Sequence, residues 1–209
     1  MLFRSYYAIG FRADGTAVLG KPGVKVSVDL GYAVDDGSGS PVELIRPVIA
    51  VNKARTNSGV FLYTYDFNAR HTTGTTEAGV NVVCTVEQGQ LAIGSTVTAR
   101  VERVEETTVT SIQPDQIVLS ANANADAYYT NALRNMSAGS EVTLTVSANA
   151  GWDDVEYAVG ALYCLAENGA VASGLAAGVN PRTAVGQKAD GTLVFYTIDG
   201  RRSGYSIGA

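Results

Sequence analysis

The sequence predicts an α+β fold made mostly of antiparallel or mixed β-sheet with few helices. Most of its apolar-rich segments alternate with period two, which places successive side chains on opposite faces of a strand. The regular alternation of strands and helices that marks a doubly wound parallel sheet is absent from the sequence. With 209 residues, of which 46% are hydrophobic and 17% charged, the chain is long enough to bury a globular core, and one domain is expected.

Charge and hydropathy exclude two classes of interaction. The 15 basic and 20 acidic residues give a formal net charge of −5, and no basic cluster is long enough to follow a nucleic-acid backbone. No apolar run approaches the roughly 20 residues needed to cross a bilayer, and no signal peptide opens the sequence. We therefore expect neither nucleic-acid binding nor a transmembrane segment in this chain.

The N-terminal part of the chain predicts strands. Residues 6–30 predict a hairpin that turns at Asp14 and Gly15, followed by a strand with alternating apolar residues. Residues 35–41, DDGSGSP, have the composition of a flexible surface loop. Residues 43–52 then predict a buried strand, so this region supplies sheet rather than helix.

The middle of the chain predicts further strands and one helix. Residues 79–86, 95–104 and 141–147 are rich in β-branched residues and alternate with period two, which indicates strands. Residues 122–136 instead carry apolar side chains at helical spacing and predict one amphipathic helix, which Gly139 would end. The apolar side chains at this spacing are Ala125, Tyr128, Tyr129, Ala132 and Leu133.

The C-terminal segment predicts a β-hairpin. Pro181 favours extended geometry before it, and Asp190-Gly191 between two apolar runs suits a tight turn. A two-residue turn would place Arg182 opposite Asp199. A three-residue loop with a bulged glycine would place Arg182 opposite Ile198 instead.

Charged residues gather in the sequence at the open end of this hairpin. Arg182 begins one strand, and Asp199, Arg201 and Arg202 follow the other. Guanidinium groups bind phosphate oxygens in bidentate geometry, and a nearby carboxylate can move protons. These residues therefore predict a site for a phosphate-bearing substrate, and the alternative is a surface ion pair beside a polar loop.

Motifs in the hairpin and after it resemble those of the phosphodiester glycosidase family. The matching residues are PRTAVG at 181–186, DG at 190–191, DGR at 199–201 and GYSIG at 204–208. The family includes the enzyme that uncovers mannose 6-phosphate by removing N-acetylglucosamine, together with many bacterial surface proteins. Further resemblance lies in Asn52 and Arg55, which match an N-x-x-R element.

Three other segments extend the resemblance. LYT at 62–64 matches a family element, and PDQIVLS at 114–120 resembles a short family strand. The segment at 156–169 resembles one in which the family usually has a run of glycines. Ala161 replaces one of those glycines, which puts a close backbone approach to ligand at that point in doubt.

The resemblance implies a secreted or cell-surface bacterial hydrolase that cleaves the glycosidic bond of a sugar phosphodiester, with N-acetylglucosamine as the expected sugar. Asp199 would be the catalytic carboxylate. The residues that would bind substrate are Arg182, Thr183, Gly200, Arg201, Ser206, Asn52 and Arg55. For Asn52 and Arg55 the alternative is that the first caps a turn and the second is solvated. No metal ligand or cofactor is assigned, and His71 is the only histidine, which excludes a multi-histidine site within this sequence.

The resemblance also predicts the extent of the domain. Residues 6–209 would form a phosphodiester glycosidase domain that lacks its C-terminal part, and residues 1–5 would be a non-native leader. Family members continue with a helix and a glycine-rich N-x-D-G-G-x-S segment, which would supply a second catalytic carboxylate. We therefore expect the chain alone to be inactive.

Cys84 and Cys164 both lie among apolar neighbours and are expected to be buried free thiols.

The rival function is a non-catalytic β-rich module of the cell surface, which would bind a phosphorylated glycan or act as a spacer.

Overall fold

The computed structural model describes residues 7–35, 41–175, 178 and 180–206. These residues form fourteen strands, one α-helix and one short 3-10 helix, which confirms the predicted strand-rich α+β class with few helices. The chain divides into two compact units, one of residues 24–148 and one that joins the N-terminal segment to residues 149–209. The expected leader at 1–5 and most of the expected loop at 35–41 lie outside the described residues.

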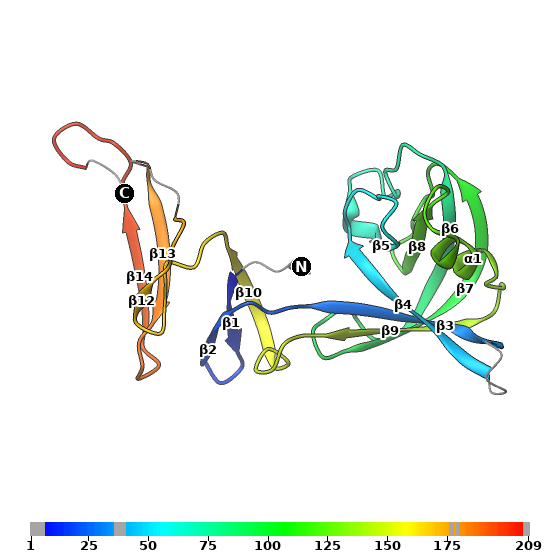
Figure 1. Cartoon of the computed structure of the whole chain (residues 1–209), viewed down its shortest axis with the longest axis horizontal. Coiled ribbons are helices and arrows are strands. Elements are labelled where there is room, and N and C mark those ends of the chain that lie inside the picture. Colours follow the sequence, from blue (N-terminus) through cyan, green and yellow to red (C-terminus); the bar gives the residue numbers. More distant parts are fainter. Residues whose placement is uncertain (1–6, 36–40, 176–177, 179, 207–209) are drawn as a thin grey trace. The chain divides into compact units, whose positions relative to one another are not determined.

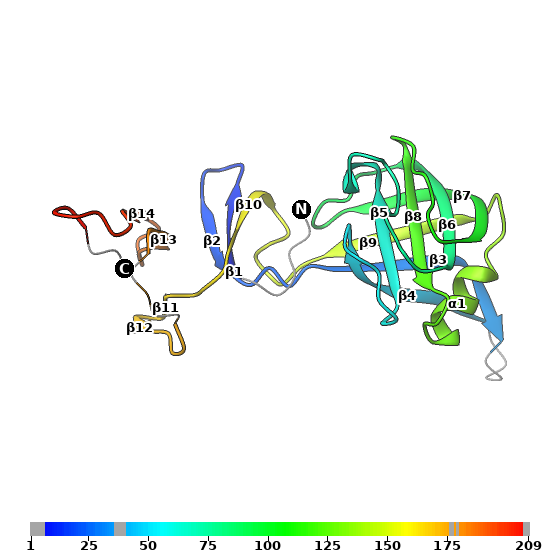
Figure 2. The ribbon, with the colours of Figure 1, turned by 90° about the horizontal axis from the view of Figure 1, so that it is seen from above.

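Seven strands of the first unit close into a barrel (Figures 1 and 2). They are β3 (Lys25–Asp35), β4 (Pro41–Val51), β5 (Val60–Thr64), β6 (Gly79–Gln88), β7 (Thr96–Thr107), β8 (Gln116–Asn122) and β9 (Glu141–Ser147). Their order around the barrel is β3-β4-β5-β8-β6-β7-β9, and β9 returns to pair with β3. Every neighbouring pair is antiparallel except β4 and β5, which run parallel. The strands expected in this region are therefore confirmed, but their closure was not predicted.

The barrel has apolar side chains on both sides of several strands. Along β5, Val60 and Leu62 point into the interior core, while Phe61 and Tyr63 belong to a second cluster on the other face. Strands buried on both faces carry continuous apolar runs, whereas strands with one solvated face alternate. Strand β8 is of the first kind and is buried at every position. Strand β9 alternates between buried and exposed side chains.

A glycine permits one close approach within the barrel. Gly31 lies where the pairing of β3 with β4 is irregular, and its φ of 70° belongs to the left-handed region that favours glycine. A Cβ atom there would lie 1.8 Å from the backbone oxygen of Glu141. The neighbouring strand could not pack so closely against any other residue.

The single α-helix, α1 (Ala127–Arg134), is shorter than the sequence predicted. Its N-terminus is capped by Asp126, whose carboxylate accepts a hydrogen bond of 2.7 Å from the Tyr128 amide. The expectation that it starts at Asn122 was wrong, because Asn122 is the last residue of β8 and pairs with Gly79 of β6. Leu133 places the apolar face of α1 in the barrel core. In the described part of the chain, no helix is long and apolar enough to span a membrane.

The second unit contains three small sheets and few buried hydrophobic residues. Its strands are β1 (Tyr7–Arg12), β2 (Ala17–Gly20), β10 (Val155–Ala161), β11 (Ala166–Glu167), β12 (Ala170–Val171), β13 (Arg182–Gln187) and β14 (Leu193–Ile198). They pair as β10-β1-β2, β11-β12 and β13-β14. The β1-β2 hairpin confirms the turn predicted at Asp14 and Gly15. Because β1 precedes the barrel in sequence and β10 follows it, the barrel segment is inserted within this unit.

Candidate functional site at the open end of the β13-β14 hairpin

The β13-β14 hairpin has the register of a three-residue loop. Arg182 pairs with Ile198 and Gln187 with Leu193, so the two-residue turn that would have placed Arg182 opposite Asp199 is wrong. The loop closes with a 2.9 Å hydrogen bond from the Lys188 amide to the Thr192 oxygen. The left-handed φ of 87° at Gly191 gives the bulge that shifts the register by one residue.

The loop chemistry explains why this register is stable. The Thr192 amide donates a 2.9 Å hydrogen bond to the Asp190 carboxylate. That bond favours the ionised side chain and holds the pKa of Asp190 below its usual value. The same arrangement recurs in the β1-β2 hairpin, where the Thr16 amide donates to Asp14 at 2.8 Å. An aspartate two residues before a threonine thus fixes both turns.

The shifted register separates the charged side chains that the sequence analysis had paired. Asp199 follows the end of β14 and Arg182 begins β13; both residues are exposed. No ion pair between them occurs in the described part of the chain. The guanidinium of Arg182 makes only a long contact of 3.5 Å to its neighbouring Pro181 oxygen. The surface ion pair that the first register implied is therefore not formed.

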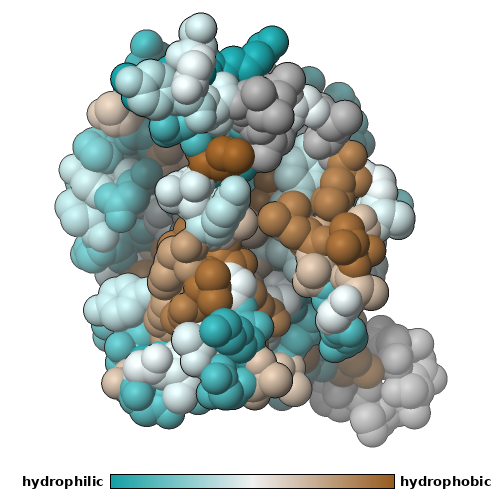
Figure 3. Space-filling view, turned by 90° about the vertical axis from the view of Figure 1, so that its left-hand side faces the viewer, coloured by the Kyte–Doolittle hydropathy of each residue, from teal (hydrophilic) through white to brown (hydrophobic). Residues whose placement is uncertain are grey.

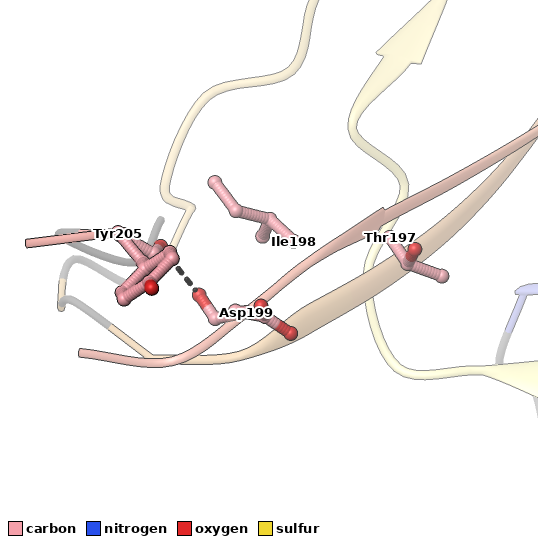
Figure 4. A pocket seen from close by; sticks show the side chains of 5 residues that line it. Thr197, Ile198, Asp199 and Tyr205 are labelled. Atoms are coloured by element: carbon pink, nitrogen blue, oxygen red, sulfur yellow. Dashed lines mark hydrogen bonds between the residues drawn. The ribbon is translucent and has the colours of Figure 1, made fainter. Parts of the chain in front are cut away.

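The segment after β14 folds back as a compact loop (Figure 4). The Ser206 hydroxyl donates a 2.9 Å hydrogen bond to the backbone oxygen of Asp199. The Arg202 amide donates to the Ser206 oxygen, also at 2.9 Å. Gly200 packs against Pro181, because a Cβ at position 200 would lie 2.9 Å from the proline Cδ. The PRTA and DGR motifs therefore meet at this end of the hairpin.

The loop and β14 together line an open hollow of about 470 Å³. Its lining residues are Thr197, Ile198, Asp199, Tyr205 and Ser206 (Figure 4). Asp199 supplies the only ionisable carboxylate of this lining. Two other predicted site residues pair with strand residues that line the hollow, since Arg182 lies opposite Ile198 and Thr183 opposite Thr197. The structure thus gathers the C-terminal group of predicted site residues in one place.

The charge of this region favours an anionic ligand. Arg182, Arg201 and Arg202 are all exposed, and within the described residues none of them pairs with a carboxylate. Against these three cations stands the single carboxylate of Asp199. Guanidinium groups that are not neutralised by the protein can bind phosphate oxygens by charge-assisted hydrogen bonds.

Asn52 belongs to the barrel unit and not to the hairpin unit. Its side-chain amide donates to the Thr64 hydroxyl at 2.8 Å, and its oxygen accepts from the Thr64 amide at 2.9 Å. Its φ of 51° is left-handed, which asparagine tolerates better than most residues. These bonds fasten the segment that follows β4 to the end of β5.

Arg55 also belongs to the barrel and lies in a network of polar side chains. Its guanidinium donates to Ser120 at 2.5 Å and to Asn81 at 3.1 Å, and also to the Asn122 side chain and the Glu77 backbone oxygen. Burial lowers the pKa of Arg55 below its ordinary value. All of these partners belong to the protein, so the alternative that Arg55 is a solvated side chain is wrong. A role for Asn52 and Arg55 in binding substrate stays a prediction.

Thr197, Ile198 and Tyr205 line the hollow but were not predicted as site residues from the sequence. Tyr205 stands within a matched motif, and its 82% exposure cannot be read from the sequence. The two cysteines are free; Cys84 is buried as expected, whereas Cys164 is half-buried, so the expectation of burial was wrong for the second. Among the described residues, no three His, Cys, Asp or Glu side chains cluster closely enough to hold a metal ion.

Comparison with known protein families identifies the same family as the C-terminal motifs. The model of a family described as phosphodiester glycosidase matches residues 94–209, which confirms the resemblance first seen in those motifs. No curated protein matches the sequence.

Two solved structures share the fold. A hypothetical protein from Synechocystis superposes with a TM-score of 0.61 at 14% identity, covering 98% of this chain and 36% of that one. A protein of Burkholderia pseudomallei K96243, whose name suggests export, gives a TM-score of 0.54 at 16% identity over 98% of this chain and 47% of its own. At these identities the likeness concerns the fold alone. This chain spans less than half the length of either protein.

Proposed function

The chain belongs to the phosphodiester glycosidase family, and from this premise we propose that its hairpin site takes part in hydrolysing the bond between a sugar and a phosphodiester. The observation that carries the proposal is the charge of the site. Three guanidinium groups that no carboxylate neutralises in the described structure belong to the strand and loop beside an open hollow, and Asp199 is the one carboxylate that lines it. N-acetylglucosamine is the sugar that we propose. A phosphodiester supplies the anion that such cations require.

The reaction divides naturally between the two kinds of side chain. The oxygen of water forms a bond with the anomeric carbon, and the bond from that carbon to the phosphate oxygen breaks. The electron pair of the broken bond stays on the phosphate, which leaves as a monoester joined to the aglycone. One proton of the attacking water passes to Asp199, acting as general base, and from there to solvent.

A phosphate leaving group lessens the need for a second carboxylate in the proposed reaction. Most glycosidases use two carboxyl groups, one of which protonates a poorly stabilised leaving oxygen. A phosphate monoester is stable as a dianion near neutral pH, since its second pKa is about 6. Its departure therefore requires stabilisation of negative charge more than it requires a proton. Arg182 and Arg201 are suited to that task, because charge-assisted hydrogen bonds strengthen as charge develops on the phosphate oxygens.

The role of Arg182 is tested by replacing it with lysine. Arg182→Lys keeps the positive charge but loses the bidentate fork, so the affinity for a methyl phosphodiester of N-acetylglucosamine should fall about ten- to a hundredfold. Titration followed by NMR measures the dissociation constant, and thermal melting should be unchanged. Arg103→Lys, at an exposed arginine of the barrel, serves as the matched control and should not alter binding.

The role of Asp199 is tested by Asp199→Asn, which nearly preserves the shape of the side chain. Loss of a general base should lower turnover about a hundred- to ten-thousandfold, while the dissociation constant of the sugar phosphodiester changes little. Because the solved relatives are longer than this chain, turnover is measured on residues 1–209 and on the full product of the gene. Equal turnover by Asp199→Asn and the original protein would remove Asp199 from the catalytic role.

The second candidate is a module that binds phosphorylated glycan without cleaving it. One observation favours it: within the described residues, the Asp199 side chain has no hydrogen-bond or ion-pair partner that would orient it as a base. Binding of the sugar phosphodiester without hydrolysis, by both protein lengths, would support this candidate. We propose an extracellular or cell-surface location for either function. One protein of similar fold, from Burkholderia pseudomallei, carries a name that describes it as exported.

A further inference from the structure

Tyr205 is the most exposed of the large apolar side chains in the described part of the chain, at 82% of its full area. It also lines the hollow that contains Asp199 (Figure 4). An exposed aromatic ring beside a polar hollow is a common mark of a ligand-binding surface, because such a ring gains free energy when a ligand covers it.

The backbone and one cation hold this ring in place. The Tyr205 amide donates a 2.9 Å hydrogen bond to the Arg202 oxygen, and the Ser206 amide donates to the same oxygen at 3.0 Å. Gly204 supplies the left-handed φ of 76° that the turn requires. The guanidinium of Arg202 lies 4.8 Å from the centre of the ring, within the range of a cation–π contact. Since the side chain remains 82% exposed, the face away from Arg202 is open to a ligand.

The chemistry of a sugar fits this open face. In a glucose-type pyranose the axial C–H bonds form an apolar face, and the equatorial hydroxyl groups point outward. The negative face of an aromatic ring attracts such weakly positive hydrogens, while the phenol hydroxyl stays available at the rim as a hydrogen-bonding group. Arg201 and Arg202 follow Asp199 in the same loop, so a phosphate bound by these cations would bring its sugar towards the ring.

We propose that Tyr205 is a stacking platform for the sugar ring of the substrate and thereby a determinant of specificity for glycosyl phosphodiesters over simple phosphate esters. This inference rests on the proposed function, which needs only the arginines and Asp199. The phosphate groups bind at the guanidinium groups, and Tyr205 contacts the sugar alone. The two parts of the ligand are therefore recognised by different side chains.

The separation can be measured with two probes. One is the methyl phosphodiester of N-acetylglucosamine, and the other is dimethyl phosphate, which has the same charge but no sugar. Tyr205→Ala should weaken binding of the sugar phosphodiester about three- to tenfold and leave the binding of dimethyl phosphate unchanged. Tyr205→Phe keeps the ring and should bind both probes within about twofold of the original protein.

Two controls make the result specific to this ring. Tyr157→Ala removes another exposed tyrosine of the same unit, 72% exposed on β10, and should leave both affinities unchanged. Arg182→Lys should weaken both probes, because both carry the phosphate. Saturation-transfer NMR adds a direct readout, since saturation of the aromatic protons should pass to the sugar C–H protons in the original protein and in Tyr205→Phe, and should be lost in Tyr205→Ala.

The outcomes separate this inference from the proposed function. An unchanged affinity of Tyr205→Ala for the sugar phosphodiester, with Arg182→Lys still weakened, would overturn the platform and leave the proposed function standing. An equal loss for both probes in Tyr205→Ala would also overturn the platform, because it would place the effect at the phosphate. If the original protein binds neither probe, the proposed function and the platform both fail.

Discussion

The barrel unit and the hairpin unit use their apolar residues in opposite ways. Nearly all buried hydrophobic side chains in the described structure belong to the barrel, and the second unit contributes only Ala8, Ile9, Ala17 and Trp152. Conversely, twelve of the seventeen large hydrophobic residues that are exposed in the described structure belong to the second unit. Figure 3 shows a face of the molecule on which several apolar side chains are open to view.

The difference follows from how the two sets of strands are closed. A closed barrel pairs both edges of every strand and encloses a core. Among the described residues, no third strand pairs with the β13-β14 ribbon, and it has exposed side chains on both faces, among them Phe195 and Tyr196. Such a two-stranded ribbon is marginal by itself. Stability therefore resides in the barrel, whereas the candidate site lies at the open end of the less stable element.

The largest contrast is expected in the reactivity of the two thiols. Burial raises the pKa of Cys84, in the barrel, to about 12, so at pH 8 only about one thiol in ten thousand is ionised. Cys164, in the second unit, is half-buried. Alkylation with iodoacetamide, followed by mass spectrometry, should label Cys164 at least about a thousandfold faster than Cys84, which must wait for the barrel to open. In Cys164→Ser the protein should stay unlabelled until denaturant is added; similar rates for both thiols would contradict the contrast.

The next largest effect is expected from matched leucine substitutions. Leu62 is fully buried in the barrel core, whereas Leu162 is 69% exposed in the second unit. Leu62→Ala should lower the free energy of unfolding by about 3 kcal/mol, through lost transfer free energy and the cavity left behind. Leu162→Ala should change it by less than about 0.5 kcal/mol. Urea unfolding followed by circular dichroism measures both, and comparable losses would show that the second unit has a core of its own.

Replacing Arg55 tests whether this residue belongs to the barrel or to the site. Arg55→Met leaves the buried Asn81, Ser120 and Asn122 side chains without their shared donor, so the free energy of unfolding should fall by about 2 kcal/mol. Arg103→Met, which removes an exposed arginine paired with Glu102 and Glu105, should cost less than about 1 kcal/mol. Unchanged stability with weakened binding of sugar phosphodiester would instead assign Arg55 to the substrate.

The smallest effect concerns the contact between the two hairpin motifs. Gly200→Ala places a methyl group against Pro181 and should weaken binding of the sugar phosphodiester several-fold, corresponding to about 1 kcal/mol. Gly186→Ala is the matched control, because a Cβ at that position meets no atom within 4 Å. Equal affinities for the two variants would show that the packing of Gly200 on Pro181 does not shape the site.

Local patterns in the sequence predicted the elements of the fold more completely than their arrangement. Alternation located β3, β6, β7 and β9 of the barrel, and Asp14-Gly15 and Asp190-Gly191 located two turns. The closing of β9 on β3 and the parallel pairing of β4 with β5 depend on contacts distant in sequence, which periodicity does not encode. Asn122 was assigned to the helix because its neighbours have helical spacing, but pairing with β6 keeps it in a strand.

For the candidate site, the sequence predicted the motifs but not their geometry. The two turn types differ by one residue, and both place Gly191 at positive φ. A two-residue type I′ turn would also need positive φ at Asp190, which Asp190 does not have, so Arg182 lies opposite Ile198 and not Asp199. Chain position likewise could not show that the partners of Arg55 are Asn81, Ser120 and Asn122, which come from other strands. The family motifs therefore identify residues that belong together, and side-chain packing decides which of them face a ligand.

Hydrogen exchange with and without ligand tests most directly whether the barrel supplies the stability and the hairpin the site. We expect amides of β3 to β9 to exchange slowest and not to respond to the methyl phosphodiester of N-acetylglucosamine. Amides of residues 181–206 should exchange fast in the protein alone and slow down when that ligand is added. Equal protection of both units without ligand, or ligand-induced protection around Asn52 and Arg55 and not in residues 181–206, would contradict it.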